Sequence, residues 1–173
     1  MGVSFDILTK PWVPVLDAAG QKTELGLLET LERAHELQAI QTASPMEEYS
    51  VYRFLIVFLM DALRPEDGEE DIGGLLEAEQ FDMEAIQDYL TQCRKEGVSF
   101  DLFDAARPFL QTTYVEAWDR EAKPASTLDY TIPNGNNHIH FDHRRNEISY
   151  TPGKALRMLL TAQNFCTAGA QGY

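Results

Sequence analysis

The sequence is short of basic residues and of long apolar runs, and each shortage excludes a class of protein. Its 173 residues include 14 lysines and arginines against 28 acidic residues, which gives a net charge of −14. Binding of nucleic acid through bulk phosphate attraction needs clustered basic side chains, so this chain does not hold nucleic acid in that way. The longest apolar run, Phe54 to Met60, is far shorter than the roughly 20 residues needed to cross a bilayer.

Cysteine is also scarce. The spacing of the two cysteines, Cys93 and Cys166, is not typical of a metal site. Two reduced thiols are the favoured interpretation, and a disulfide between them is kept as an alternative. No basic segment followed by an apolar stretch opens the chain, so we expect no secretory signal and a cytoplasmic protein. A hydrophobic fraction of 44% at this length predicts one folded domain over residues 1–173.

The charge is distributed unevenly along the chain. Residues 1–104 carry 22 acidic and 7 basic side chains, a net charge of −15, whereas residues 105–173 carry 6 and 7, a net charge of +1. A solvated acidic surface explains the first part without any function. A contact with nucleic acid is therefore expected in the C-terminal part, helped by partner subunits.

The N-terminal region predicts a small antiparallel sheet. Its extended pieces are Phe5–Leu8, Trp12–Leu16 and Lys22–Leu25, separated by proline and glycine turns. Pro11 and Pro14 indicate that the region forms edges or bulges, because proline lacks the N–H that a central strand donates.

Apolar spacing and end signals predict helices over Leu27–Ile40, Ser44–Arg64, Asp82–Glu96 and from Pro152 through Gln163. A Ser-x-x-Glu capping box at Ser44 and Glu47 begins the second helix. From Tyr49 to Leu63 this helix is apolar almost all round, which is typical of a central helix that is buried.

Three shorter stretches complete the expected fold. The acidic Pro65–Gly74 is expected to be a loop, Phe100–Gln111 to pack on the core, and Ile148–Tyr150 to form a short strand. The predicted class is α+β, with a small antiparallel β element near the N-terminus packed with about four α-helices.

Three histidines, His138, His140 and His143, lie within six residues and suggest possible metal chemistry. With Asp142 they could ligate zinc or serve a metal-dependent nuclease. In an extended segment, however, alternate residues share a face, which separates His143 from the other two. With no cysteine or carboxylate pair to complete the shell, a recognition loop is favoured over a metal site, and a plain polar loop stays open.

Motifs for catalysis are absent from the sequence. It contains no Gly-x-Ser-x-Gly elbow, no glycine-rich phosphate loop that opens a helix, and no plausible cysteine–histidine pair. We therefore expect a protein that is not an enzyme, with no cofactor and no metal.

Several short motifs follow one another along the chain. They are FDILTKPWVPV from Phe5, LLE from Leu27 with Ala34-His35, RPFLQ from Arg107, Pro133 with Asn136-Asn137 and Phe141-Asp142-His143, and Leu159-Leu160 with Gln163. In this order and spacing they resemble the large subunit of the type I-E CRISPR surveillance complex, the CasA subunit of Cascade. The resemblance covers only the N-terminal portion of that family, whose members end in a helical bundle. It implies a truncated single domain over residues 1–173.

The resemblance implies a non-catalytic subunit that binds the protospacer-adjacent motif of target DNA, helps to start strand separation and recruits the helicase–nuclease. The implied partners are other Cascade protein subunits, the CRISPR guide RNA, target double-stranded DNA and the helicase–nuclease, with no membrane. A different interpretation also fits the acidic N-terminal part: an interaction protein that mimics DNA and occupies a nucleic-acid-binding partner.

Two candidate sites follow from the resemblance. Asn137, His140, Phe141 and Asp142 match the loop that contacts the 5′ handle of the guide RNA. Amides and imidazoles hydrogen-bond base edges, and an aromatic ring stacks on an unpaired base. Gly169 and Gly172 match the glycine loop that approaches the minor groove of the motif duplex, although Gln171 stands where glycine is expected.

Overall fold

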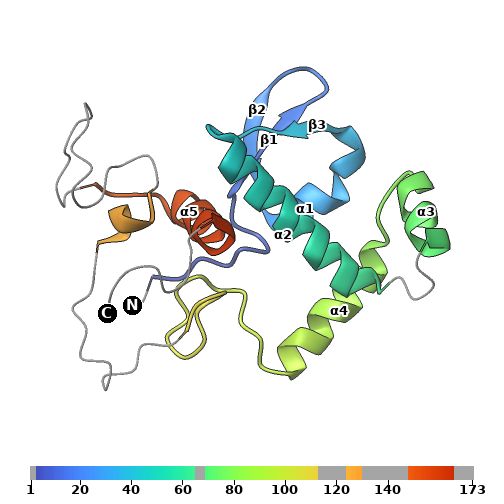
Figure 1. Ribbon diagram of the computed structural model, residues 1–173. Coiled ribbons are helices and arrows are strands. Elements are labelled where there is room, and N and C mark those ends of the chain that lie inside the picture. The colour runs from blue at the N-terminus through green and yellow to red at the C-terminus, as the bar shows by residue number, and fades with distance from the viewer. Residues whose placement is uncertain (1–2, 65–68, 113–123, 130–147, 166–173) are drawn as a thin grey trace.

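The computed structural model describes residues 3–64, 69–112, 124–129 and 148–165, and it confirms the α+β class (Figure 1). In this described part a three-stranded sheet near the N-terminus packs with five α-helices. The strands are β1 (Val13–Asp17), β2 (Lys22–Leu25) and β3 (Leu37–Ile40). The helices are α1 (Leu27–Glu32), α2 (Pro45–Leu63), α3 (Glu69–Glu77), α4 (Met83–Lys95) and α5 (Pro152–Phe165). None of these helices is long and apolar enough to span a membrane.

The sheet is antiparallel, with strand order β2-β1-β3. The expectation that prolines confine this region to edges or bulges is wrong for Pro14, which lies in the central strand opposite Glu24. The position tolerates proline because the pairing of β1 with β3 begins only at Val15. The carbonyl of Pro14 accepts a hydrogen bond from the N–H of Gln41, the residue after β3, at 2.9 Å. A register shift does occur in β1, between Leu16 and Asp17.

The helix predicted over Leu27–Ile40 is too long. It ends at Glu32, and after a 3-10 turn at Ala34–Glu36 the chain forms β3. Ile40 pairs with Val15 of β1 and is buried, so a strand satisfies the apolar pattern as well as a helix would. Residues 37–40 form a strand because they pair with the open edge of β1. This pairing depends on a distant segment and cannot be predicted from the local apolar pattern.

The ends of α2 and α4 agree with the predicted signals. Ser44 caps α2 by accepting from the Met46 N–H at 3.2 Å, and the helix ends before Arg64, whose φ is 42°. Asp82 caps α4, and Gly97, with φ of 78°, follows its end. The predicted capping box is wrong in its second half, in which the side chain of Glu47 would bond to the start of its own helix. Glu47 bonds instead to Lys154 and Arg157 of α5.

Two short stretches differ from their predicted form. The segment predicted as a loop, Pro65–Gly74, overlaps α3, in which Ile72, Leu75 and Leu76 have helical spacing and line a hollow facing α2. Ile148–Tyr150 is irregular, although a strand was predicted there. The hydroxyl of Tyr150 donates a hydrogen bond to the side chain of Asp129.

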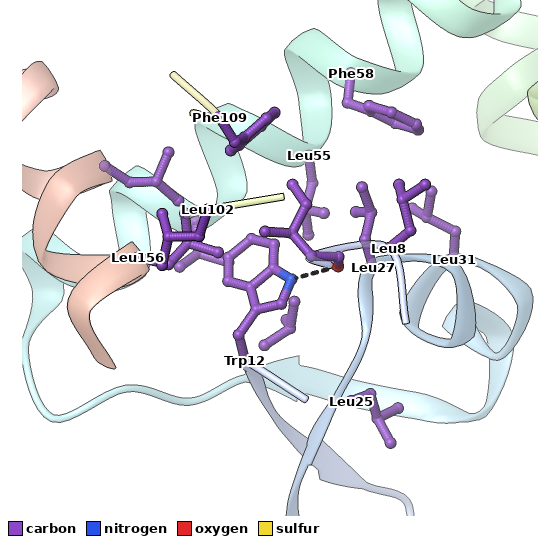
Figure 2. Close-up of a cluster of buried hydrophobic side chains, with 14 of the residues drawn as sticks. Leu8, Trp12, Leu25, Leu27, Leu31, Leu55, Phe58, Leu102, Phe109 and Leu156 are labelled. Atoms are coloured by element: carbon purple, nitrogen blue, oxygen red, sulfur yellow. Dashed lines mark hydrogen bonds between the residues drawn. The ribbon is translucent and has the colours of Figure 1, made fainter. Parts of the chain in front are cut away.

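The core is built around Trp12, which is fully buried (Figure 2). Its indole N–H donates to the Ile7 carbonyl at 2.9 Å, so the one polar atom of the ring is satisfied. The ring meets Phe54 of α2 edge-on, with centroids 5.7 Å apart. Leu102 and Phe109 are buried in the same cluster, which confirms that Phe100–Gln111 packs on the core, and Leu156 brings in α5.

Only one side of α2 is covered by the described residues. The helix packs against α5, α4 and β3, yet five large apolar side chains on it are exposed: Tyr49, Tyr52, Ile56, Val57 and Met60. The prediction of a helix buried all round is therefore wrong for this side in the described structure.

Candidate nucleic-acid interface

Both predicted contact segments fall outside the described residues. This applies to Asn137, His140, Phe141 and Asp142, and equally to Gly169 and Gly172. The neighbouring His138 and His143 also lie outside. The structure does describe the residues on either side of these segments, and these residues show how each segment joins the core.

The described residues on either side of segment 130–147 are joined by a hydrogen bond. Tyr150 donates its hydroxyl hydrogen to Asp129 Oδ2 at 3.0 Å, and the Asp129 side chain is almost completely buried. Burial and this hydrogen bond both raise the pKa of Tyr150, because a tyrosinate would be poorly solvated beside a carboxylate. The contact joins residues 21 positions apart. The chain therefore enters and leaves segment 130–147 at neighbouring points, an arrangement that we call the loop-base clamp.

The first half of α5 is fixed by a buried charge network centred on Arg157. The Arg157 Nε donates to Glu47 Oε1 at 2.5 Å, and its Nη1 donates to the Trp12 carbonyl at 2.7 Å and to Glu24 Oε1 at 2.8 Å. Lys154 Nζ donates to the other oxygen of Glu47 at 2.6 Å. Glu47 is only 2% exposed, so these contacts compensate for the removal of its carboxylate from water.

Backbone contact brings the same end of α5 against the N-terminal segment. A Cβ added to Gly153 would lie 3.0 Å from the Pro11 carbonyl oxygen and 3.2 Å from the Cα and Cβ of Trp12. Glycine at this position permits the close approach of the helix to the N-terminal segment that precedes β1. The loop-base clamp at Tyr150 lies just before this tightly packed turn.

The last turn of α5 is attached by exposed contacts. The rings of Phe165 and Tyr49 lie 5.6 Å apart, and Arg53 Nη1 donates to Asn164 Oδ1 at 2.5 Å. Gln163 Nε2 donates to the Leu110 carbonyl at 2.7 Å. Segment 166–173 thus begins at a point attached to α2 and to the stretch after Phe109.

Helix α5 separates the points at which the described chain meets the two predicted contact segments. Its 14 residues span about 21 Å at 1.5 Å per residue. One segment joins the helix at its N-terminal end, through Tyr150, and the other continues from its C-terminal end, after Phe165. The attachment points of the two candidate segments therefore lie toward opposite ends of one helix.

The residues that hold this arrangement were not among those predicted from the sequence. A signal existed for Arg157, a cation that stands in the sequence directly between the apolar Leu156 and Met158, both of which are buried. No local signal pairs Asp129 with Tyr150, because residues so far apart meet only through the fold.

Metal chemistry finds no support in the described part. No three histidine, cysteine, aspartate or glutamate side chains gather closely enough there to hold an ion. Cys93 is buried as a free thiol, and Cys166 lies outside the described residues.

Comparison with known proteins assigns the family. The family model described as CRISPR-associated protein Cse1 matches residues 6–173. The chain belongs to the Cse1 family. This confirms the resemblance to CasA, because Cse1 and CasA are joined in the name of a curated relative from Thermus thermophilus, CRISPR-associated protein CasA/Cse1. That relative is 35% identical over 167 residues, which are 95% of this chain and 32% of the relative.

Solved Cse1 structures share the fold. Cse1 from Acidimicrobium ferrooxidans superposes with a TM-score of 0.75 at 26% identity, over 94% of this chain and 29% of its own. Thermus thermophilus CasA (Cse1) gives a TM-score of 0.72 at 33% identity, over 92% and 30%. A chain of a solved CRISPR RNA-guided surveillance complex has the same fold, with a TM-score of 0.72 at 22% identity. This chain thus spans about a third of the length of its Cse1 relatives.

Proposed function

We propose that the chain is a non-catalytic part of a CRISPR RNA-guided surveillance complex. In this proposal it contacts the 5′ handle of the guide RNA and the protospacer-adjacent motif of target DNA, and it helps to recruit the helicase–nuclease. The observation that carries the proposal is the Cse1 family match over residues 6–173. The fold shared with a chain of a solved CRISPR RNA-guided surveillance complex supports it.

The guide-RNA contact is assigned to Asn137, His140, Phe141 and Asp142. The loop-base clamp supports this assignment, because the contact between Asp129 and Tyr150 joins the residues on either side of the segment and so fixes where the segment meets the domain. Amide and imidazole groups would hydrogen-bond exposed base edges, and Phe141 would stack on an unpaired base.

The DNA contact is assigned to Gly169 and Gly172. Backbone without a Cβ can approach the floor of the minor groove, where the base-pair code is degenerate and several motifs are accepted. The attachment of the last α5 turn to Tyr49 and Arg53 supports this assignment, since it gives the segment a defined starting point.

The charges of the described residues support a dependence on partners. Arg157 and Lys154 are paired with Glu47, and Arg157 also with Glu24, so their charges are largely neutralised within the protein. With a net charge of −14, the isolated chain is expected to bind duplex DNA poorly. Fluorescence anisotropy with random duplexes tests this, and sub-micromolar binding by the chain alone would contradict it.

A mutation tests the RNA contact directly. Phe141→Ala should weaken co-elution with the guide RNA and the sister subunits in gel filtration, while circular dichroism shows an intact fold. Phe103→Ala is the matched control, because Phe103 is a 43% exposed ring outside the candidate loop. Equal co-elution of both variants would remove Phe141 from the contact. Blockage of target binding by the chain, without co-assembly, would favour the DNA-mimic alternative.

A further inference from the structure

Arg53 of α2 is held next to the start of segment 166–173. Its Nη1 donates to Asn164 Oδ1 at 2.5 Å. One turn earlier on α2, the ring of Tyr49 contacts that of Phe165, with centroids 5.6 Å apart. These two contacts join the last described turn of α5 to α2, along which α5 packs (Figure 1). The guanidinium group is therefore bonded to a residue that stands just before the candidate DNA segment.

The amide of Asn164 is oriented so that its oxygen faces Arg53. Its Nδ2 donates to the Leu160 carbonyl of the preceding turn at 2.9 Å. Because the amide nitrogen is used in this way, the oxygen is the atom that can accept from the arginine. An arginine carries five N–H donors. Within the described structure, Asn164 takes one of them and leaves the others available to a ligand.

Arg53 is exposed and has no carboxylate partner among the described residues, although acidic residues of the chain outnumber basic ones two to one. By contrast, Arg33, Lys154 and Arg157 are all paired with glutamates. On α2 itself, an ion pair with Arg53 would need an acid three or four positions away. Those four positions hold Tyr49, Ser50, Ile56 and Val57. The positive charge is thus fixed in place by a neutral partner and is not compensated within the described structure.

A contact between this acidic chain and duplex DNA needs a cation close to the contact. Backbone that approaches the minor groove neutralises no phosphate, and a net charge of −14 repels the duplex. The planar guanidinium group of arginine matches the oxygens of a phosphate and can bind two of them at once.

We propose that Arg53 donates to a backbone phosphate of the target duplex, beside the minor groove that Gly169 and Gly172 approach. The inference rests on the proposed function and deepens it, because it assigns a phosphate contact to a residue on a helix of the core. Phosphate contacts fix the position of a protein on DNA without reading the base sequence. Arg53 would therefore hold the duplex in place while the glycine segment approaches the bases.

The test uses the complex assembled from the full chain, its sister subunits and the guide RNA. Fluorescence anisotropy measures its binding to a target duplex over a series of salt concentrations. Arg53→Gln should weaken binding about five- to tenfold near 0.1 M salt. The slope of log affinity against log salt should become shallower by about 0.9, the value for one phosphate contact on duplex DNA. Arg53→Lys should keep the slope, because it keeps the charge.

Arg94→Gln is the matched control, since it removes the same charge from an exposed arginine in the last turn of α4, away from α5 (Figure 1). It should leave both the affinity and the salt slope near those of the wild type. Equal binding by Arg53→Gln and Arg94→Gln would overturn the inference and leave the proposed function standing. Absence of target binding by the wild-type complex would overturn the proposed DNA contact, and the inference with it.

Two further readouts separate a phosphate contact from other roles of Arg53. A phosphate contact carries no base information, so Arg53→Gln should weaken binding by the same factor with and without the protospacer-adjacent motif. Loss of motif discrimination at an unchanged salt slope would mean that Arg53 only positions the segment, which would overturn the inference. Weaker co-elution of Arg53→Gln with the guide RNA in gel filtration would assign the contact to RNA and would also overturn it.

Discussion

The two ends of α5 are attached to the molecule by different chemistry. Near its start, Arg157 and Glu47 form a buried ion pair that also involves Trp12, Glu24 and Lys154. At its last turn, one exposed hydrogen bond and one ring contact join Asn164 and Phe165 to α2. A buried charge network is costly to break, whereas exposed contacts contribute little free energy.

The difference indicates that the contacts at the start of α5 contribute most of the free energy that holds this helix on the domain. Local opening starts where few buried contacts hold the chain. The end next to the candidate RNA segment is therefore expected to stay in place under conditions in which the last turn, next to the candidate DNA segment, opens. Substitutions at the two ends of α5 test this contrast.

The buried network should give the largest effect. Arg157→Met is expected to lower the free energy of unfolding by about 3–5 kcal/mol, because Glu47 keeps a buried charge with one partner fewer. Lys154→Met, at a side chain that is 28% exposed, should cost only about 1 kcal/mol. Urea unfolding of both variants measures the difference. Similar losses would show that the network does not centre on Arg157.

The close approach at Gly153 should give the next largest effect. Alanine normally stabilises a helix interior relative to glycine by about 1 kcal/mol. Here Gly153→Ala should instead lower the free energy of unfolding by about 1–2 kcal/mol, because its Cβ meets backbone of Pro11 and Trp12 that cannot yield easily.

The matched control for this substitution lies in α3. An added Cβ at Gly73 meets nothing within 4 Å, so Gly73→Ala should be neutral or stabilising by up to about 1 kcal/mol. Thermal and urea unfolding give the sign for each variant. A stabilising effect at both positions would show that the start of α5 is less tightly packed than the structure indicates.

Features that depend on neighbours in sequence could be predicted. The caps at Ser44 and Asp82 were predicted because these side chains accept hydrogen bonds from backbone N–H groups that are unpaired at a helix start. The end of α4 was predicted at Gly97 because glycine readily adopts the positive φ found there. The class followed from apolar spacing. The family followed from motifs in order, and the comparisons confirm it.

Features that depend on distant partners could not be predicted. Leu37–Ile40 has helical spacing with α1, yet it pairs with β1. Apolar spacing could not show that one side of α2 stays open in the described structure, nor that Asp129 meets Tyr150. The candidate residues 137, 140–142, 169 and 172 came from the resemblance and stay predictions.

The loop-base clamp should give a smaller, pH-dependent effect. Tyr150→Phe is expected to cost about 1 kcal/mol near neutral pH, from the lost hydrogen bond to Asp129. The raised pKa of Tyr150 in the folded protein makes its contribution complete below about pH 10, the ordinary tyrosine value. The contribution is then lost as the pH rises through the folded value.

Urea unfolding between pH 7 and pH 11 tests this. Tyr89, whose pKa is also raised, produces a decline of the same sign in every variant. The relevant quantity is therefore the gap between wild type and Tyr150→Phe, which should shrink as the pH rises. Tyr49→Phe is the control, since its ring is 54% exposed and the substitution keeps the ring. A gap that does not change with pH would contradict the role given to the hydroxyl.

The exposed end of α5 should give the smallest effect. Arg53→Ala removes the hydrogen bond to Asn164 but leaves the ring contact between Tyr49 and Phe165. Because the arginine is solvated in both the folded and the unfolded chain, the free energy of unfolding should fall by less than about 1 kcal/mol. Hydrogen exchange should instead show faster exchange in the last turn of α5 and unchanged exchange around Arg157. A loss as large as that of Arg157→Met, or faster exchange along the whole helix, would mean that both ends are held equally firmly.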